Sequence, residues 1–197
     1  MTRIGITGGI GSGKTYVCQL LKQRGIPVYN CDEEAKRLMT ESPVIRRKLC
    51  GILGDKAYLD NALNKNLIAQ YIFTDNNHAA RINAIVHPVV RQDFLRWAAL
   101  QNSPIVAQEC ALLFESGFQD TVDATIEVFA PLSLRLQRAT QRDHATTEQI
   151  LARMAQQMNE EEKQQRADYC ILNDSTIDLE EQIDHILNQL SNKYTNK

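Results

Sequence analysis

The sequence lacks a long run of apolar residues. Glycine and Lys14 interrupt the first apolar stretch, and no later run reaches the length needed to cross a bilayer. It also lacks a marked excess of charge, because 24 acidic and 22 basic residues leave a formal charge of −2. We therefore expect no secretory leader, no membrane partner and no nucleic-acid partner. These absences predict a cytoplasmic protein.

Cysteine and histidine are too scattered for a metal centre or a disulfide framework. The five cysteines are an odd number without a C-x-x-C pair, and the four histidines lack metal-ligand spacing. We expect reduced thiols in the core of a cytosolic protein. The cysteines are Cys18, Cys31, Cys50, Cys110 and Cys170.

What is present is typical of a single globular α/β domain. The 197 residues are 43% hydrophobic and 23% charged, enough for a sizeable core. Strand-like and helix-like stretches alternate, which predicts a parallel sheet covered by helices on both faces. We place the whole chain, 1–197, in one domain. The expected strands are residues 3–7, 26–29, 104–108, 124–130 and 168–172.

Two helical regions stand out between these strands. From Asp32 to about residue 102 the pattern stays helical, in several amphipathic stretches. Later, Thr146 and Gln149 predict a capping box at the start of a helix. The apolar face expected for that helix consists of Ile150, Leu151, Met154 and Met158.

Residues 8–15 read GGIGSGKT and fit the pattern G-x-x-x-x-G-K-[ST], between an expected strand and an expected helix. The four glycines can adopt positive φ, which lets backbone N–H groups converge on phosphate oxygens at a helix N-terminus. Lys14 would reach the β and γ phosphates, and the Thr15 hydroxyl would bind Mg²⁺. A dinucleotide site fits poorly, because Gly-Lys-Thr has no role there and no acidic residue ends a clear second strand.

Other motifs narrow the class of phosphate-binding protein. The chain has neither D-x-x-G nor [NT]-K-x-D, which a GTPase would need, and it is too short for a motor or transporter ATPase. A small-molecule kinase remains, with one insertion to hold the acceptor and another to close over ATP. The helical stretch 33–102 and the charged segment 143–166 are the candidates for these insertions.

Asp32 follows the second expected strand. Ligands of open α/β sheets lie beyond the carboxyl ends of the strands, so a carboxylate here could take the proton of an acceptor hydroxyl. The alternative is that Asp32 only caps a helix that begins at Glu33. Position alone leaves both interpretations open.

Arg135, Arg138 and Arg142 are spaced to share one helix face. We expect Arg142, at the entrance to the polar segment, to hold the transferring phosphoryl group. For Arg135 we expect a solvated, salt-bridged position. Glu109 ends the third strand and either orients a Mg²⁺-bound water or pairs with a neighbouring helix.

Taken in order, these motifs resemble the dephospho-CoA kinase family over nearly the whole chain. The resemblance implies a P-loop kinase core, with a five-stranded parallel sheet flanked by helices, a helical acceptor-binding insertion and a lid. It implies transfer of the γ-phosphate of ATP to the ribose 3′-hydroxyl of dephospho-CoA, the last step of coenzyme A biosynthesis, with Mg²⁺ as cofactor. The stretches that carry it are ITGGIGSGKT, NCDEEAKRL, IVHPVVR, ECALLFESGF, LQRATQRD, ILARMAQQM and EEKQQRADYCILND.

The resemblance also implies roles for individual residues. Asp32 matches the family's catalytic aspartate, and Lys14 and Arg142 are the expected catalytic cations. His87 matches the family's His-Pro on the acceptor-side helix, where we expect a contact and no chemistry. Lys65 stands where the family has an acceptor-region arginine. The expected ATP-binding residues are Gly11, Ser12, Gly13, Lys14, Thr15 and Tyr16.

The chain departs from the family pattern at three places. Asn30 replaces the first aspartate of Asp-Ala-Asp, Ala111 replaces the proline of Pro-Leu-Leu, and Lys65 replaces the arginine. These changes bear on rate and on acceptor contacts more than on the reaction.

The same core also suits an alternative, a nucleoside or nucleoside monophosphate kinase. A nucleotide-binding regulator without turnover fits less well, since binding alone needs neither Asp32 nor the arginines. We expect ATP and dephospho-CoA as partners, and a monomer or weak homo-oligomer.

Overall fold

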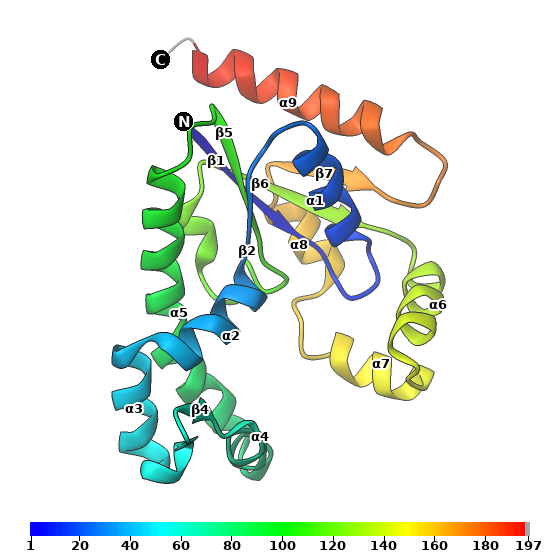
Figure 1. The fold of residues 1–197 in the computed structure, drawn as a ribbon. Helices are drawn as coiled ribbons and strands as arrows, with labels where there is room; N and C mark the ends of the chain where they lie inside the picture. The colour runs from blue at the N-terminus through cyan, green and yellow to red at the C-terminus, as the bar shows by residue number, and fades with distance from the viewer. Residues whose placement is uncertain (196–197) are drawn as a thin grey trace. The chain divides into compact units, whose positions relative to one another are not determined.

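The computed structural model describes residues 1–195, except the side chains of Asn76, Tyr194 and Thr195 (Figure 1). Its contacts divide the chain into two compact units. One unit is Met1–Tyr29 with Leu100–Lys197, and it contains nearly all of the central sheet. The other unit is Asn30–Ala99, and it is almost entirely helical.

The five expected strands form one parallel sheet in the order β2-β5-β1-β6-β7, which confirms the predicted fold class. Their ends differ from the predicted ranges by one or two residues. β1 lies at the centre between β5 and β6, and sheets of this kind bind ligands beyond the carboxyl ends of their strands. The strands are β1 (Thr2–Thr7), β2 (Val28–Asn30), β5 (Ile105–Glu109), β6 (Ala124–Phe129) and β7 (Tyr169–Leu172).

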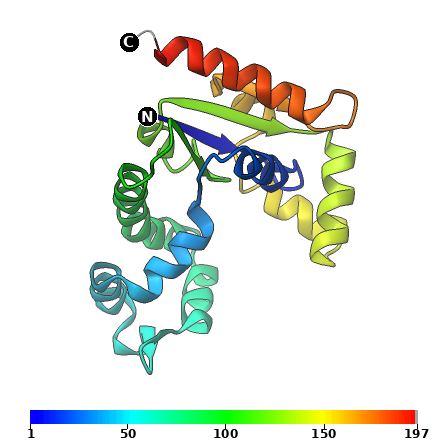
Figure 2. The same cartoon turned by 45° about the horizontal axis from the view of Figure 1, so that its top comes forward.

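Helices cover the sheet, and α1 and α9 pack together on one of its faces (Figure 2). Ile4, Ile6, Val17 and Ile183 of this layer are almost completely buried. The helical elements of the unit are α1 (Lys14–Gln23), the 3₁₀ turn η2 (Phe118–Thr121), α6 (Leu132–Asp143), α7 (Thr147–Met154), α8 (Glu160–Arg166) and α9 (Leu179–Thr195).

Two local expectations in this unit have different outcomes. The capping box of Thr146 and Gln149 is present at the start of α7. The prediction that Met158 continues the apolar face of α7 is wrong, because the helix ends at Met154. The backbone N–H groups just beyond Met154 turn back onto carbonyls of the last turn, which closes the helix.

All five cysteines are free thiols, and Cys18, Cys31 and Cys110 are buried as expected. The expectation of core positions is wrong for Cys170, which is exposed, and only partly right for the half-buried Cys50. Cys170 lies on β7, the last strand in the sheet order. Because an edge strand has a neighbouring strand on one side only, its side chains are covered less completely, and Cys170 stays exposed.

The unit Asn30–Ala99 packs its helices around buried residues such as Leu38, Ile45, Leu49 and Phe94. It also contains a small hairpin that the sequence did not predict. Its turn residues Asp60 and Asn61 have φ of 48° and 66°, as two-residue hairpin turns require. The elements are α2 (Cys31–Glu41), α3 (Pro43–Leu53), the 3₁₀ turn η1 (Asp55–Ala57), β3 (Tyr58–Leu59), β4 (Ala62–Leu63), α4 (Lys65–Thr74) and α5 (Asn76–Ala99).

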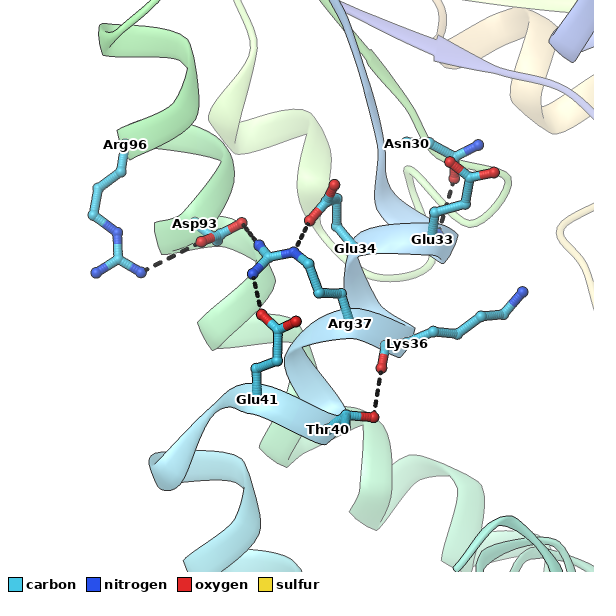
Figure 3. Close-up of polar contacts among 9 residues, drawn as sticks. All are labelled: Asn30, Glu33, Glu34, Lys36, Arg37, Thr40, Glu41, Asp93 and Arg96. Atoms are coloured by element: carbon cyan, nitrogen blue, oxygen red, sulfur yellow. Dashed lines mark hydrogen bonds and ion pairs between the residues drawn. The ribbon is translucent and has the colours of Figure 1, made fainter. Parts of the chain in front are cut away.

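Arg37 ties α2 to α5 within this unit (Figure 3). Its guanidinium lies 2.8 Å from Asp93 of α5 and 2.9 Å from Glu41 of its own helix, and it also pairs with Glu34. The side chain is 41% exposed, so each pair adds little free energy of folding on its own. Of the three carboxylates only Asp93 lies on α5, so of these three ion pairs it is the one with Asp93 that joins the two helices.

Candidate active site

The loop between β1 and α1 uses two of its four glycines for backbone conformation. Gly11 and Gly13 have φ of 81° and 93°, a region that other residues rarely adopt. A Cβ on Gly11 would lie 2.2 Å from the carbonyl oxygen of Arg135, and one on Gly13 would lie 1.9 Å from the Asn173 amide nitrogen. A side chain at either position would therefore strain the backbone and displace a neighbouring group. The first two glycines of the motif do not have positive φ.

The loop leads into α1 at Gly13, and among the described residues no side chain caps this helix. Its first turn contains no acidic residue. The first N–H groups of a helix lack partners within the helix, and the helix dipole makes that end positive. An anion is the natural partner for this end, as the motif predicted.

Glu109, at the end of β5, contacts the first turn of α1 directly. One of its carboxylate oxygens accepts hydrogen bonds from Lys14 Nζ at 2.9 Å and from the Thr15 hydroxyl at 2.8 Å. The Glu109 side chain is only 6% exposed. Of the two interpretations left open by the sequence, pairing with a neighbouring helix is observed, and the orientation of a Mg²⁺-bound water stays a prediction. Burial and the adjacent Glu109 charge raise the pKa of the Cys18 thiol.

Asn173, just after β7, supports the other side of the loop. Its side-chain amide donates to the Ser12 carbonyl at 2.8 Å, and Arg138 donates to the Asn173 carbonyl at 3.0 Å. Sequence reasoning missed these contacts, because 161 residues separate Asn173 from Ser12 and no local pattern marks the pair. Beside the first turns of α1 lies an open pocket. It is lined by Tyr16, Leu20, Asn173, Ser175, Ile177, Asp178, Leu179 and Glu180.

In the helical unit, Asn30 caps α2. Its side chain accepts hydrogen bonds from the N–H groups of Asp32 and Glu33 at 3.0 and 3.1 Å. The helix begins at Cys31, so Asp32 already lies in its first turn. The alternative that Asp32 acts only as the cap is therefore wrong. Asp32 is exposed.

His87 of α5 faces Asp32 and Arg91 within the same unit. Burial is the main cause that lowers the His87 pKa, the charge of Arg91 lowers it further, and Asp32 opposes both. His87 is therefore neutral at pH 7. The other acceptor-side candidate, Lys65, is exposed at the first position of α4, directly after the cap residue Asn64.

Arg142 and Arg135 belong to the same helix and lie in opposite environments. Arg142 is exposed in the last turn of α6, and its guanidinium contacts both carboxylate oxygens of Asp143 at 2.7 and 3.1 Å. Arg153 of α7 binds the same carboxylate at 3.0 Å, and these arginines hold the pKa of Asp143 low. Arg135 is only 5% exposed, so the expectation of a solvated position is wrong. It pairs with Glu160 at 2.9 Å.

The fold and the loop define the class. A phosphate-binding loop after the central strand of a parallel sheet, in this strand order, is the arrangement of P-loop kinases. The comparisons then give the particular family. The model of the dephospho-CoA kinase family matches residues 2–178, and the chain belongs to that family.

Individual relatives agree with this family. The chain is 46% identical to dephospho-CoA kinase of Bacteroides fragilis over 182 residues, which cover 92% of this chain and 89% of that protein. It is 41% identical to dephospho-CoA kinase of Porphyromonas gingivalis, over 88% of this chain and 86% of the other. A crystal structure from Thermus thermophilus has a TM-score of 0.82 and 33% identity, covering 96% of this chain and 97% of that one.

The chain is thus an ATP-dependent phosphotransferase that acts on dephospho-CoA. The resemblance read from the sequence is confirmed, and the alternative of a nucleoside or nucleoside monophosphate kinase is not supported. Among the described residues, no helix is both long and apolar enough to cross a membrane.

Proposed function

We propose that the two helix N-termini described above divide the work of this kinase. The N-terminus of α1 binds the phosphates of ATP, with Lys14 and Arg142 on the transferring phosphoryl group. Asp32, in the first turn of α2, acts as general base for the ribose 3′-hydroxyl of dephospho-CoA. The observation that carries this proposal is the Asn30 cap, which leaves the Asp32 carboxylate without a capping duty.

On the ATP side, the proposed contacts run from Gly11 to Tyr16. The uncapped amides and the positive φ of two glycines support phosphate binding along this stretch. The pocket lined by Tyr16 and Leu20 lies next to the same turn and would take the adenosine end of ATP. Lys14 would move from Glu109 to the β and γ phosphates.

The residues beside Lys14 fit a magnesium ion. Thr15 and Glu109 bring a hydroxyl and a carboxylate together at 2.8 Å, and Mg²⁺ prefers hard oxygen donors with substrate phosphates completing its shell. Within the described residues no group of three or more acidic, histidine or cysteine side chains could hold a metal alone. When bound, the ion would neutralise charge on the phosphates. Thr15 and Glu109 would hold it.

On the acceptor side, we propose that His87 and Lys65 contact dephospho-CoA. His87 faces Asp32 and is neutral, so it can donate or accept a hydrogen bond without adding charge beside the general base. Lys65 is exposed and keeps the positive charge of the family's arginine, although it cannot offer two hydrogen bonds in a fork.

We propose further that residues 143–166 form the lid and residues 33–102 the acceptor insertion, in a cytoplasmic monomer or weak homo-oligomer. The Arg142 guanidinium donates two hydrogen bonds to the Asp143 carboxylate. When the lid closes, phosphate oxygens would replace this carboxylate as acceptors. The backbone amides of α7 should exchange their hydrogens more slowly after ATP and dephospho-CoA are added. Unchanged exchange throughout 143–166 would contradict the lid.

The chemistry is tested by one assay with several acceptors. ADP formation would be followed with dephospho-CoA, adenosine and AMP, and the phosphorylated position identified by NMR. We expect turnover with dephospho-CoA at its 3′-hydroxyl, lost in Asp32→Asn. Normal turnover in that variant would remove Asp32 from the proposed mechanism.

A further inference from the structure

The outer side of the phosphate loop is held by side chains that are distant in sequence. Arg135 Nε donates to the Ile10 carbonyl at 3.0 Å, and the Gln157 side-chain carbonyl accepts from the Ile10 N–H at 3.1 Å. Both backbone polar groups of Ile10 are thus bound by side chains from α6 and from the segment before α8. A loop fixed on its outer side can present its inner N–H groups to phosphate without first becoming ordered.

Gly9, the preceding residue, is held in the same way. Its backbone amide hydrogen-bonds to Glu160, which also pairs with Arg135 at 2.9 Å. A Cβ on Gly9 would lie 2.3 Å from a Glu160 oxygen and 2.4 Å from an Arg135 nitrogen. The backbone conformation does not require a glycine at this position, because φ at Gly9 is not positive. A glycine is favoured here because the Arg135–Glu160 ion pair leaves little room for a side chain.

Behind the pair lies a fully buried carboxylate. Glu127 of β6 is 0% exposed, and in the described part of the chain neither of its oxygens has a hydrogen-bond partner. It lies opposite Thr7, the last residue of β1 before the loop. Such a group is costly to bury when ionised, because no donor stabilises its charge.

Charged and titratable groups of α6, α8, β7 and the segment after β5 lie near Glu127, while β1 contributes the uncharged Thr7. These groups are Glu160 and Lys163 of α8, Arg135 of α6, Glu115 after β5 and Cys170 of β7. Lys163 is itself fully buried, 3.7 Å from Glu115 and 3.3 Å from the Ala111 carbonyl. Burial and the neighbouring Glu160 charge raise the pKa of Glu127 to about 8.

The charge of this cluster depends on one proton. With Glu127 neutral, the carboxylates of Glu115 and Glu160 balance the cations Arg135 and Lys163. With Glu127 ionised, the cluster carries one extra negative charge behind a loop that must hold a polyphosphate. Charges in a poorly solvated site interact strongly, so ATP and the ionised form disfavour each other.

We propose that Arg135, Gln157 and Glu160 are positioning residues for the phosphate loop, and that the loop binds ATP tightly only while Glu127 carries its proton. This inference rests on the proposed function only in taking ATP as the ligand of the loop. It predicts that ATP binding near pH 8 takes up a proton at Glu127.

The test is calorimetry of ATP binding without acceptor, at several pH values and in two buffers of different ionisation enthalpy. We expect the wild type to take up part of a proton at pH 8, and its ATP affinity to fall above pH 8 by up to about tenfold per pH unit, the limit for one required proton. The Glu127→Gln variant should take up a smaller fraction of a proton when it binds ATP, and its ATP affinity should not fall above pH 8. Glu161→Gln, an exposed change next to Glu160 on α8, should take up protons and bind ATP as the wild type does.

The positioning residues are tested by Gln157→Ala and Glu160→Gln. We expect a rise in the dissociation constant and KM for ATP with little change in kcat. A lower melting temperature with unchanged ATP affinity would mean that Gln157 and Glu160 only stabilise the fold and do not position the loop. No proton uptake by the wild type at pH 8, or equal uptake in Glu127→Gln, would overturn the role of Glu127. Since calorimetry of ATP binding needs no phosphoryl transfer, failure of the proposed chemistry would appear separately, in kcat.

Discussion

Strands β1 and β2 of one sheet each lead into a helix, and the two helix N-termini are finished in opposite ways. In the described part of the chain α1 has no side-chain cap, whereas Asn30 caps α2 with two hydrogen bonds. Uncapped amides attract an anion, while a capped turn leaves a nearby carboxylate available for chemistry. In the proposed function, the same kind of strand-to-helix junction thus binds phosphate at α1 and presents the Asp32 carboxylate at α2.

The surroundings of the two termini differ as well. The loop before α1 is enclosed by buried charged groups, including Glu109, Arg135 and Glu127. The first turn of α2 exposes Asp32 and Glu33 to solvent. Changes near α1 should therefore alter activity, stability and pH dependence together. Changes near α2 should separate activity from stability.

The largest effect is expected for Asp32→Asn. Loss of a general base should lower kcat by about a hundred- to ten-thousand-fold. Stability should change by less than about 1 kcal/mol, the worth of one charge near a helix N-terminus. Turnover and melting temperature measured side by side test this, with Glu33→Gln as the matched control that should keep its activity. Equal losses in both variants would mean that general charge near α2 matters, not Asp32.

Lys14→Ala should lower activity by at least ~100-fold, the usual effect of removing one group that stabilises transition-state charge. Unlike Asp32→Asn, it should also lower stability, because Glu109 remains buried without its cation. The double variant Lys14→Ala with Glu109→Gln should recover stability and stay inactive. A Lys14→Ala protein that melts like the wild type would show that the buried pair contributes nothing to folding.

Glu127→Gln sharpens the comparison through pH. The folded protein keeps the Glu127 proton up to a pKa of about 8, whereas the unfolded chain loses it at the ordinary pKa of a glutamate. The stability that comes from this protonated side chain is therefore fully present only when the pH is below the ordinary glutamate pKa. It is lost as pH rises toward 8, by at most about 1.4 kcal/mol per pH unit. Urea unfolding at several pH values should show this loss in the wild type relative to Glu127→Gln. Parallel pH profiles would contradict it.

The smallest effect is expected for Asn30→Ala, which removes the α2 cap and should cost about 1 kcal/mol at every pH. Asn30→Asp should cost almost nothing, because aspartate caps equally well. It places a second carboxylate two residues from Asp32, and like charges disfavour ionising both, so the activity optimum should move to higher pH. Chemical denaturation and pH–rate profiles measure the two effects. A stability loss in Asn30→Asp equal to that in Asn30→Ala would contradict the capping role.

The sequence predicted what depends on neighbours along the chain. The GGIGSGKT motif, the strand before it and the helix after it are local patterns, and the structure has all three. The capping box at Thr146 was also local and is confirmed. The Asp60-Asn61 turn carried an equally local signal, which a closer reading of turn residues could have found.

What the sequence could not predict depends on tertiary contacts. Nothing near Arg135 shows that its guanidinium reaches the Ile10 carbonyl, 125 residues earlier. Gln157 and Glu160 look like ordinary polar residues of a solvated segment. The Asp32 ambiguity had a different cause, since helix starts are uncertain by one or two residues and Asn30 was an equally good cap.

The contact between Asn173 and Ser12 has a consequence for the growing chain. The Asn173 amide that supports the Ser12 carbonyl is synthesised 161 residues after Ser12. Gly13 packs directly on the same amide. We expect nascent chains that stop before Asn173 to be unable to retain ATP, however well their earlier helices form. If so, nucleotide binding would mark a polypeptide whose synthesis has passed β7.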